Sequence, residues 1–330
     1  MKRDLKGGEK SMSSIHMLAG IPGSGKSHYA KELCKQHRAV HVATDSIRQK
    51  LFGDEAKQKN TYVVFDEAFS QIEQALAFGR NVVFDATNVS RERRLKFLKR
   101  FREVPVECHV CSTPYDIAMQ RAQSRKRRID ESVMSKFAKH FEFPVLGEGF
   151  QQLHIVHAPA DAMLSRPELE ELLADNPDHD ELFNYLSSSP HFRVMVGYDQ
   201  QNPHHSRTLS EHTYAVLEYV RAFYEGDNML AMQFAALFHD AGKPFCKVWK
   251  QIRGYYSYYG HEHVSAAIAC HVLKQMGYDE EFVLQVVNLV SFHMEILHGG
   301  DAGASHIYHL LGDEMLAQLY FFAEADTFAK

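Results

Sequence analysis

The stretch that decides the fold is "IHMLAGIPGSGKSHYAKELCKQ", residues 15–36. Its centre, Gly20–Ser27, fits the pattern G-x-x-x-x-G-K-[ST], in which backbone N–H groups surround phosphates and the lysine reaches the β/γ oxygens. The apolar run before it predicts a strand and the run after it a helix, the surroundings that a phosphate site needs. The predicted nucleotide contacts, with Mg²⁺ on the serine hydroxyl, are Gly23, Ser24, Gly25, Lys26 and Ser27.

Strand-like and helix-like segments alternate from this loop to about residue 157. This βαβ pattern predicts an α/β domain with a parallel sheet, and ligands in such sheets gather at the carboxyl ends of the strands. Two further polar signatures fall at such ends, "TDSIR" (44–48) and "DATN" (85–88). We therefore expect them to lie at the same edge as the phosphate loop.

Specific side chains in these signatures suit phosphoryl transfer. Asp45 is a candidate general base toward an acceptor hydroxyl, and Arg48, one helical turn on, a candidate clamp for an acceptor phosphate. The other interpretation is a helix-capping aspartate with a surface arginine. Asp85 occupies the position at which an acidic residue that holds Mg²⁺ is expected. The alternative interpretation is that it only forms a turn. Arg121 and Arg125 are four apart on one helix face, as lid residues over a nucleotide would be.

The composition is that of a soluble globular protein. The 330 residues predict about two domains, and no apolar run is long enough to span a bilayer. Residues 1–13 are polar and Gly/Ser-rich, so we expect a mobile leader. Five cysteines make no disulfide framework, which indicates a reducing cytoplasm. Cys108 and Cys111 have C-x-x-C spacing, but on a strand they point to opposite faces, so we expect buried cysteines rather than a redox or zinc pair.

The net charge of −5 gives no general reason to expect nucleic acid. Two local stretches, 91–102 and 121–128, are dense in arginine and lysine. A basic helix is more often a solvated face than a phosphate-binding surface, and both interpretations stay open. The lid arginines favour the phosphate interpretation for the second stretch.

Together, "GIPGSGKS", "TDSIR", "FDATN" and "RAQSR" resemble the P-loop polynucleotide 5′-kinase family over about residues 14–157. The resemblance implies that Lys26 and Ser27 bind ATP and Mg²⁺ and that Asp45 activates the 5′-hydroxyl. It further implies that Arg48 binds the phosphate of the 5′-terminal nucleotide. Arg121 and Arg125 would be lid residues, and Arg125 would also act in catalysis.

A second domain is expected beyond residue 160, where the alternation stops and long helical patterns take over. The sequence predicts a kinase domain over 14–160, a helical connection over 161–189 and an all-α domain over 190–330.

Histidines and aspartates recur near the expected helix ends of this second domain. A capping box at Thr208 and Glu211 starts one helix, and Gly242 ends another. Imidazoles and carboxylates suit Mn²⁺, Fe, Co²⁺, Ni²⁺ or Zn²⁺, and an open coordination position activates water. Any one of these histidines alone is more often a core or surface residue. The candidate ligands are His212, His239, Asp240, His261, His293 and Asp326.

The joint pattern H…HD…H…H…D resembles the HD phosphohydrolase superfamily, all-helical metal-dependent phosphatases and phosphodiesterases, over about residues 190–330. The resemblance makes Lys243 a phosphate contact. It divides the candidates into core ligands, which are His212, His239, the catalytic Asp240 and Asp326, and ligands of a second metal, which are His261 and His293. His263 is left out because it points away from His261 on a helix. His204 and His205 are either substrate contacts or turn residues.

The two modules together resemble bifunctional enzymes of RNA repair, which convert 2′,3′-cyclic phosphate and 5′-OH ends into ligatable ends. The resemblance implies ATP or another NTP with Mg²⁺ at the kinase site, a transition metal at the HD site, RNA ends favoured over DNA as substrate, and an RNA ligase downstream. Known members carry the HD module first, which leaves the placement of the two sites open here.

One alternative is a small-molecule or nucleoside kinase fused to a nucleotide-hydrolysing HD module. Another is an ATP-gated nucleic-acid-binding protein.

Overall fold

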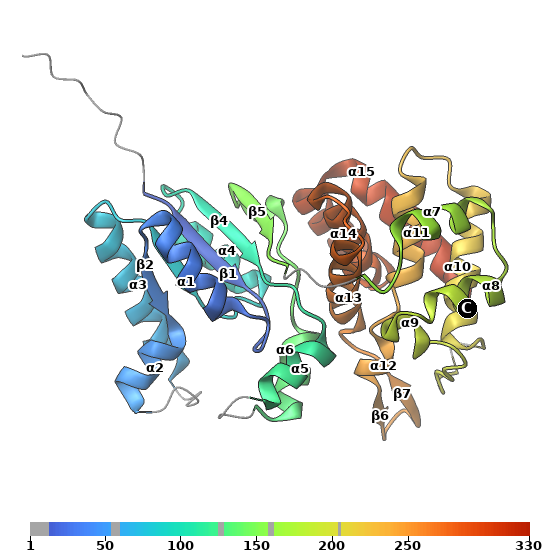
Figure 1. The fold of residues 1–330 in the computed structure, drawn as a ribbon, viewed down its shortest axis with the longest axis horizontal. Helices are drawn as coiled ribbons and strands as arrows, with labels where there is room; N and C mark the ends of the chain where they lie inside the picture. Colours follow the sequence, from blue (N-terminus) through green and yellow to red (C-terminus); the bar gives the residue numbers. More distant parts are fainter. Residues whose placement is uncertain (1–12, 54–59, 125–128, 158–161, 204–205) are drawn as a thin grey trace, which may run out of the picture.

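The computed structural model describes residues 13–53, 60–124, 129–157, 162–203 and 206–330. Within them the chain forms an α/β half followed by a helical half, which lie side by side (Figure 1). This agrees with the predicted order of a parallel-sheet domain and a helical domain. The proposed leader, residues 1–13, lies almost wholly outside the described residues.

A five-stranded parallel sheet forms the centre of the first half, with the order β2-β3-β1-β4-β5. The three central strands, β1, β3 and β4, are largely buried, as expected of a parallel sheet covered on both faces, whereas the edge strands β2 and β5 are only partly buried. Leu18 pairs with both Asp85 and His109, so the carboxyl ends of the central strands are level. The strands are β1 (Ile15–Ala19), β2 (Val40–Ala43), β3 (Val82–Asp85), β4 (Val106–Val110) and β5 (Gln152–Ile155).

Helices pack on the two faces of this sheet. Phe84 of β3 stacks on Phe97 with ring centroids 5.1 Å apart, whereas its neighbour Val83 packs against Leu33 on the other face. The helices are α1 (Lys26–His37), α2 (Thr44–Phe52), α3 (Thr61–Ala77), α4 (Arg91–Arg100), α5 (Tyr115–Gln123), α6 (Glu131–Lys139) and the short 3-10 helix η1 (Leu146–Glu148).

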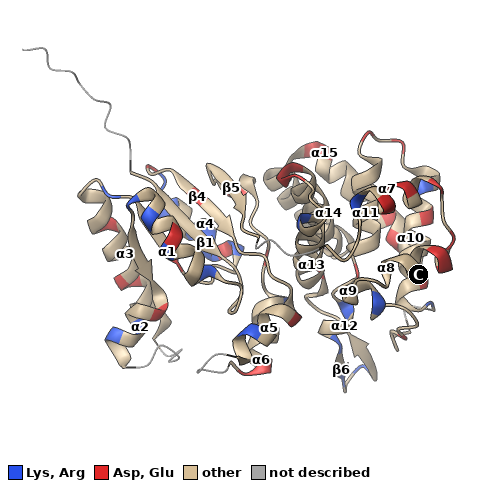
Figure 2. Cartoon of the chain, in the orientation of Figure 1, with Lys and Arg blue, Asp and Glu red and all other residues tan. Residues whose placement is uncertain are grey.

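The basic stretch 91–102 is not one solvated face. Arg94 is fully buried, and its Nε and Nη2 each donate to a carboxylate oxygen of Glu148 at 2.7 Å. Arg91 is also buried and lies 3.4 Å from the same carboxylate. In the second basic stretch Arg121 is exposed at the end of α5, and residues 125–128 lie outside the described residues. Acidic and basic residues are mixed over both halves (Figure 2).

The second half is a helical bundle with one short β-hairpin. Its last helix is kinked at Gly312, whose φ is 85°. The elements are α7 (Arg166–Ala174), α8 (His179–Leu186), α9 (Pro190–Arg193), α10 (Leu209–Phe223), α11 (Met229–Phe238), α12 (Lys243–Cys246), β6 (Val248–Lys250), β7 (Tyr255–Ser257), α13 (His261–Gln275), α14 (Glu280–His298) and α15 (Gly300–Phe328).

Of the predicted connection 161–189, the described residues 162–189 contain α7 and α8, and both helices pack on the helical half. Tyr214 donates its hydroxyl to the carbonyl of Pro177 at 2.9 Å, and Tyr278 donates to Glu170 at 2.7 Å. This segment is therefore part of the helical body.

The two halves meet through β5, α4, α5, α6 and η1 of the first half and through α9 and α12 to α15 of the second. The Arg91 guanidinium lies 4.7 Å from the ring centroid of Phe292, and Lys139 donates to the carbonyl of Cys246 at 3.4 Å. The halves also approach closely at Gly147, where an added Cβ would lie 1.9 Å from the carbonyl oxygen of Leu310. No larger residue fits there without moving η1 away from α15.

The structure also bears on two smaller expectations, the state of the cysteines and the presence of a membrane-spanning helix. Cys108 and Cys111 are both buried and free, as predicted. No helix of the described residues is both long and apolar enough to cross a bilayer.

The contact at Gly147 predicts a stability effect. We expect Gly147→Ala to destabilise the protein by about 1–3 kcal/mol, because the added methyl group overpacks the boundary between the halves. Thermal unfolding measures it. Leu146→Ala is the control, since Leu146 is 53% exposed and its truncation should stay within about 0.5 kcal/mol. Equal melting temperatures for Gly147→Ala and wild type would contradict the close approach.

Candidate active sites

The phosphate loop connects β1 to α1. Gly23 has φ 85°, and a Cβ there would lie 2.3 Å from the carbonyl oxygen of Ala118, so only glycine lets the loop pass α5. Lys26 is buried, and its ammonium donates to the carbonyl of Ile21 at 2.8 Å within the loop. Ser27 is exposed in the first turn of α1. The loop therefore ends at a helix N-terminus, where backbone N–H groups face an anion.

The "DATN" segment lies against this loop. Gly20 donates its N–H to the carbonyl of Thr87 at 2.9 Å, and the Asn88 amide donates to the carbonyl of Leu18 at 2.7 Å. Asp85 is buried, and its carboxylate lies 3.3 Å from His41 Nε2. The ends of β1 and β3 are thus held together, and they place Asp85 beside the loop. His41, on β2, was not among the sequence candidates.

Asp45 and Arg48 lie on α2, after β2. Arg48 Nη1 donates to Asp45 Oδ1 at 2.7 Å; the Asp45 side chain is 65% exposed and that of Arg48 only 10%. Arg48 Nε is buried and has no acceptor among the described residues. This pair therefore presents an accessible carboxylate next to a guanidinium with an unused donor. Arg121 is exposed on α5, and Arg125 lies outside the described residues.

The second site is a buried cluster at the centre of the helical half. Five helices or helix ends supply its side chains, so residues far apart in sequence converge. The members, all buried, are His212 on α10, His239 and Asp240 at the end of α11, His261 at the start of α13, His293 on α14 and Asp326 on α15.

Asp240 joins two groups within this cluster. Its Oδ2 lies 3.3 Å from the Nε2 atoms of both His212 and His239, while its Oδ1 lies 3.0 Å from His261 Nε2. His293 Nε2 is 3.3 Å from His261 Nε2, and Asp326 Oδ1 is 3.1 Å from His212 Nε2. The two groups, each with ligand atoms mutually within 4.8 Å, are His212–His239–Asp240 and Asp240–His261–His293.

Backbone carbonyls fix the orientation of every imidazole in the cluster. The Nδ1 atoms contact the carbonyls of Ala329, Ala236, Tyr258 and Val290 at 2.7–3.2 Å. Each ring therefore turns its Nε2 inward. A carbonyl that accepts from Nδ1–H sets the tautomer of a metal-binding histidine and leaves the lone pair of Nε2 for the metal.

The electrostatics of the cluster follow from burial and close charges. Burial opposes a charge on His212, but hydrogen bonds to Asp240 and Asp326 outweigh it and raise its pKa to about 9. Burial also opposes ionisation of Asp240, yet Lys243 and the neighbouring histidines hold its pKa well below the usual value. Burial, then the adjacent imidazoles, lowers the pKa of His293 to about 4. The carboxylates are thus held ionised among imidazoles.

Lys243 touches the cluster directly. Its ammonium lies 2.7 Å from Asp240 Oδ2 and donates to Gln200 Oε1 at 2.8 Å. It is buried, so Gln200, which the sequence did not single out, holds it in place. His263 is not part of the cluster, and its Nε2 lies 3.6 Å from Glu262. His204 and His205 lie outside the described residues.

A cavity of about 970 Å³ opens onto the cluster. Four of the residues that line it belong to the cluster or contact it: Asp240, Lys243, His261 and Asp326. Residues that sequence reasoning missed make up much of the remaining lining. They come from the α/β half, as Arg91 and Glu142, and from around the hairpin, as Arg253, Tyr255, Tyr258 and Tyr259. The run "YYSYYG" was a possible signal for the tyrosines. Arg91 belongs to the basic stretch 91–102, but nothing in the sequence placed it near the HD cluster.

Comparisons with known proteins match both halves. Residues 15–144 match the model of the AAA domain, and residues 209–329 match the HD domain. The chain is therefore a P-loop kinase-like domain fused to an HD domain. An HD domain implies a divalent metal, and the donor set fits one: inward-facing imidazole nitrogens with ionised carboxylates.

Individual relatives cover only part of the chain. The CC-adding tRNA nucleotidyltransferase of Thermus thermophilus is 30% identical over 140 residues, 42% of this chain and 32% of the relative. Transcription factor bHLH140 of Arabidopsis thaliana is 24% identical over 163 residues, 46% of this chain and 17% of the relative. The chain thus spans a third or less of these relatives. A structure of the Pnkp1/Rnl/Hen1 RNA repair complex is 22% identical, covers 39% of this chain and 44% of that chain, and has a TM-score of 0.37.

The bridging position of Asp240 predicts how metal content responds to mutation. We expect His293→Gln to remove about one metal equivalent and Asp240→Ala to remove both, because only Asp240 belongs to both groups. Elemental analysis of protein loaded with Mn²⁺ and desalted measures this. The half-buried His306, which is not a member of the cluster, serves as the control position, and His306→Gln should bind like wild type. Equal losses in His293→Gln and Asp240→Ala would argue against two groups.

Proposed function

We propose that this protein heals broken nucleic acid ends, with RNA favoured. Its α/β half transfers the γ-phosphate of an NTP to a 5′-OH end, and its HD half removes a 2′,3′-cyclic, 2′ or 3′ phosphate. The observation that carries the proposal is the cavity at the HD cluster, which combines candidate metal ligands with cationic and aromatic side chains.

The size and lining of that cavity favour a nucleotide over a lone phosphate. Pockets of roughly 300–1,000 Å³ hold whole small molecules, and this one lies at the upper end of the range. Tyr255 is half-buried and Tyr259 is 60% exposed, so both rings can stack on bases. Lys243 and Arg253 supply positive charge for phosphates, whereas Arg91 in the same lining is paired with Glu142 and Glu148.

The HD cluster supports hydrolysis of a phosphate ester. A bound divalent metal supplies an activated water and stabilises charge on the phosphoryl oxygens. His212, His239, Asp240 and Asp326 would hold one ion, and Asp240, His261 and His293 a second. Lys243, fixed by Gln200, places its ammonium beside Asp240 and adjacent to the cavity, where it can contact a substrate phosphate.

The kinase site supports transfer to a hydroxyl next to a phosphate. Asp45 accepts the proton of the acceptor hydroxyl, whose oxygen bonds to the γ-phosphorus as the nucleoside diphosphate leaves with the electrons of the broken P–O bond. Arg48 Nε, buried and without an acceptor among the described residues, is available to a phosphate of the acceptor strand. Lys26 and Ser27 position the nucleotide and Mg²⁺.

RNA is favoured over DNA on one further ground. A relative with 30% identity over 140 residues is named for its action on tRNA, although this chain covers only 32% of it. The second candidate, a small-molecule or nucleoside kinase with a nucleotide-hydrolysing HD module, draws support from the net charge of −5.

The two activities should fail independently. With an RNA oligonucleotide bearing a 5′-OH and a 2′,3′-cyclic phosphate, we expect Lys26→Ala to abolish 5′-phosphorylation and spare 3′-end hydrolysis, and Asp240→Ala to do the converse. The reason is that each residue belongs to a different ligand set, one suited to Mg²⁺ and one to later first-row metals. Resolving both ends of the product by electrophoresis measures this. Loss of both activities in a folded Asp240→Ala protein would refute the two-site assignment.

The acceptor pair makes a second prediction. Asp45→Asn should abolish phosphorylation while leaving ATP binding nearly intact, and Arg48→Ala should raise KM for the oligonucleotide far more than KM for ATP. Calorimetry with ATP and steady-state kinetics measure these effects, with Lys26→Ala as the variant that weakens ATP binding. If a free nucleoside is phosphorylated as efficiently as the oligonucleotide, the small-molecule kinase is the correct assignment.

A further inference from the structure

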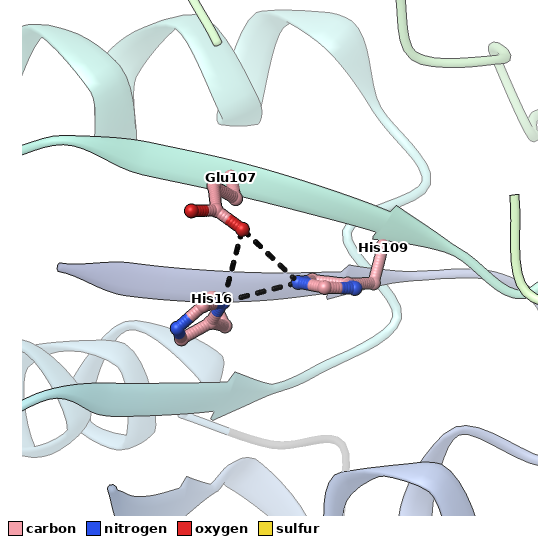
Figure 3. A group of neighbouring side chains, drawn as sticks. All are labelled: His16, Glu107 and His109. Atoms are coloured by element: carbon pink, nitrogen blue, oxygen red, sulfur yellow. Dashed lines mark hydrogen bonds and ion pairs between the residues drawn. The ribbon is translucent and has the colours of Figure 1, made fainter. Parts of the chain in front are cut away.

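A third group of potential ligands lies in the α/β half, away from both sites. His16 on β1 and Glu107 and His109 on β4 point toward one another (Figure 3). His16 and His109 are buried, and Glu107 is 22% exposed. Neither nucleotide binding nor HD chemistry uses these residues.

The sheet register brings these residues together. His16 pairs directly with Glu107 across β1 and β4, and His109, two residues after Glu107, points to the same face. The adjacent Leu18 belongs to the apolar cluster under α1, so this is the face that α1 covers. A face otherwise packed with aliphatic side chains thus carries imidazoles and a carboxylate.

The distances among the three ligand atoms fit one small ion. His16 Nδ1 lies 3.1 Å from His109 Nε2 and 3.4 Å from Glu107 Oε2, and the remaining edge, His109 Nε2 to Glu107 Oε2, is 3.9 Å. A tetrahedral ion with bonds of about 2.0–2.2 Å separates its ligands by roughly 3.3–3.5 Å. The observed edges bracket that value.

The two histidines each have an outer partner on the nitrogen that points away from the group, whereas the neighbour of Glu107 contacts the ligand oxygen itself. The outer nitrogen of His109, Nδ1, lies 3.1 Å from the hydroxyl of Tyr29 on α1. The outer nitrogen of His16, Nε2, lies 3.4 Å from Ser14 Oγ. His154 on β5 contacts Glu107 Oε2 at 3.2 Å. Such outer contacts orient the ligands of built metal sites.

We propose that His16 Nδ1, His109 Nε2 and Glu107 Oε2 bind a divalent late first-row metal ion of the Zn²⁺ type, which ties β1 to β4 beneath α1. Two imidazoles and one carboxylate are a donor set that Zn²⁺ accepts, with a fourth position for water. The ion is structural in role, because β1 and α1 flank the phosphate loop and Tyr29 follows Lys26 by three positions.

A hydrogen-bonded cluster without an ion satisfies these atoms less well. In the hydrogen bond between His16 Nδ1 and His109 Nε2, only one of the two nitrogens carries the proton and the other accepts it. Glu107 Oε2 already has a contact with His154. An ion accepts the lone pairs of all three atoms at once. The partial exposure of Glu107 and His154 gives an ion access.

Metal content of full-length variants tests the proposal. The background is Asp240→Ala, which removes the bridging ligand of the HD cluster. Protein is loaded with Zn²⁺, desalted and subjected to elemental analysis, and with Co²⁺ its visible spectrum is recorded. We expect Glu107→Gln and His109→Gln to lose about one equivalent of metal and the absorption of four-coordinate Co²⁺. His28→Gln is the matched control on α1, because its side chain is 84% exposed, and it should keep both.

Unfolding temperature provides the second readout. In the same background, Zn²⁺ should raise the melting temperature of the parent and of His28→Gln but not that of Glu107→Gln, which keeps the shape of the side chain and loses only its charge. Unchanged metal content and an unchanged Zn²⁺ effect in Glu107→Gln would overturn the site. This outcome would leave the proposed end-healing function untouched, since no assay of the two activities enters the test.

Discussion

The ion pair between Arg94 and Glu148 is the constraint on which the arrangement of the two halves rests. Both side chains are fully buried, and the guanidinium meets the carboxylate through two bonds of 2.7 Å. Glu148 also accepts the backbone N–H of Val145 at 3.2 Å, so the pair fixes η1 to α4. Loss of either partner would leave a buried charge uncompensated, at a cost of about 3–5 kcal/mol. Since Gly147 of η1 presses against α15, the geometry of this pair reaches the second half.

The cavity at the HD cluster is the functional consequence of that contact. Arg91 sits one turn before Arg94, faces Phe292 of α14 and lines the cavity together with Glu142. The α/β half thus forms part of a wall of the hydrolase site. The phosphate loop, by contrast, takes its described contacts from β1, the segment after β3, and α5, all within the first half. Of these elements, α5 also touches the second half, because Asp116 Oδ1 lies 3.4 Å from His191 Nε2 and the ring centroid of Tyr115 lies 6.3 Å from that of Phe245.

The sequence predicted those features whose chemistry is encoded locally. The phosphate loop is a contiguous motif, and the alternation of strands and helices predicted the parallel sheet and where it ends. Each HD candidate sits near a recognisable helix end or in a short motif such as "FHDAGKP", and the structure brings all six together. What the sequence did not predict depends on register and on contact between halves. His16 and Glu107 become neighbours only once β1 pairs with β4, and the C-x-x-C spacing in "PVECHVCS" drew attention to the cysteines instead.

The same distinction explains how an acidic chain can suit a nucleic acid substrate. Net charge sets long-range attraction, and at −5 it offers none, but recognition of a strand end depends on a few placed groups. Charges of both signs are mixed over both halves, and part of the basic stretch 91–102 is neutralised by Glu148 inside the protein (Figure 2). The cations that matter are therefore few and fixed: Lys26 in its loop, Arg48 beside Asp45, and Lys243 beside Asp240. Under the proposed function, such a protein would contact the terminal nucleotides of its substrate and gain little affinity from the rest of the strand, as suits an enzyme that acts on ends of any sequence.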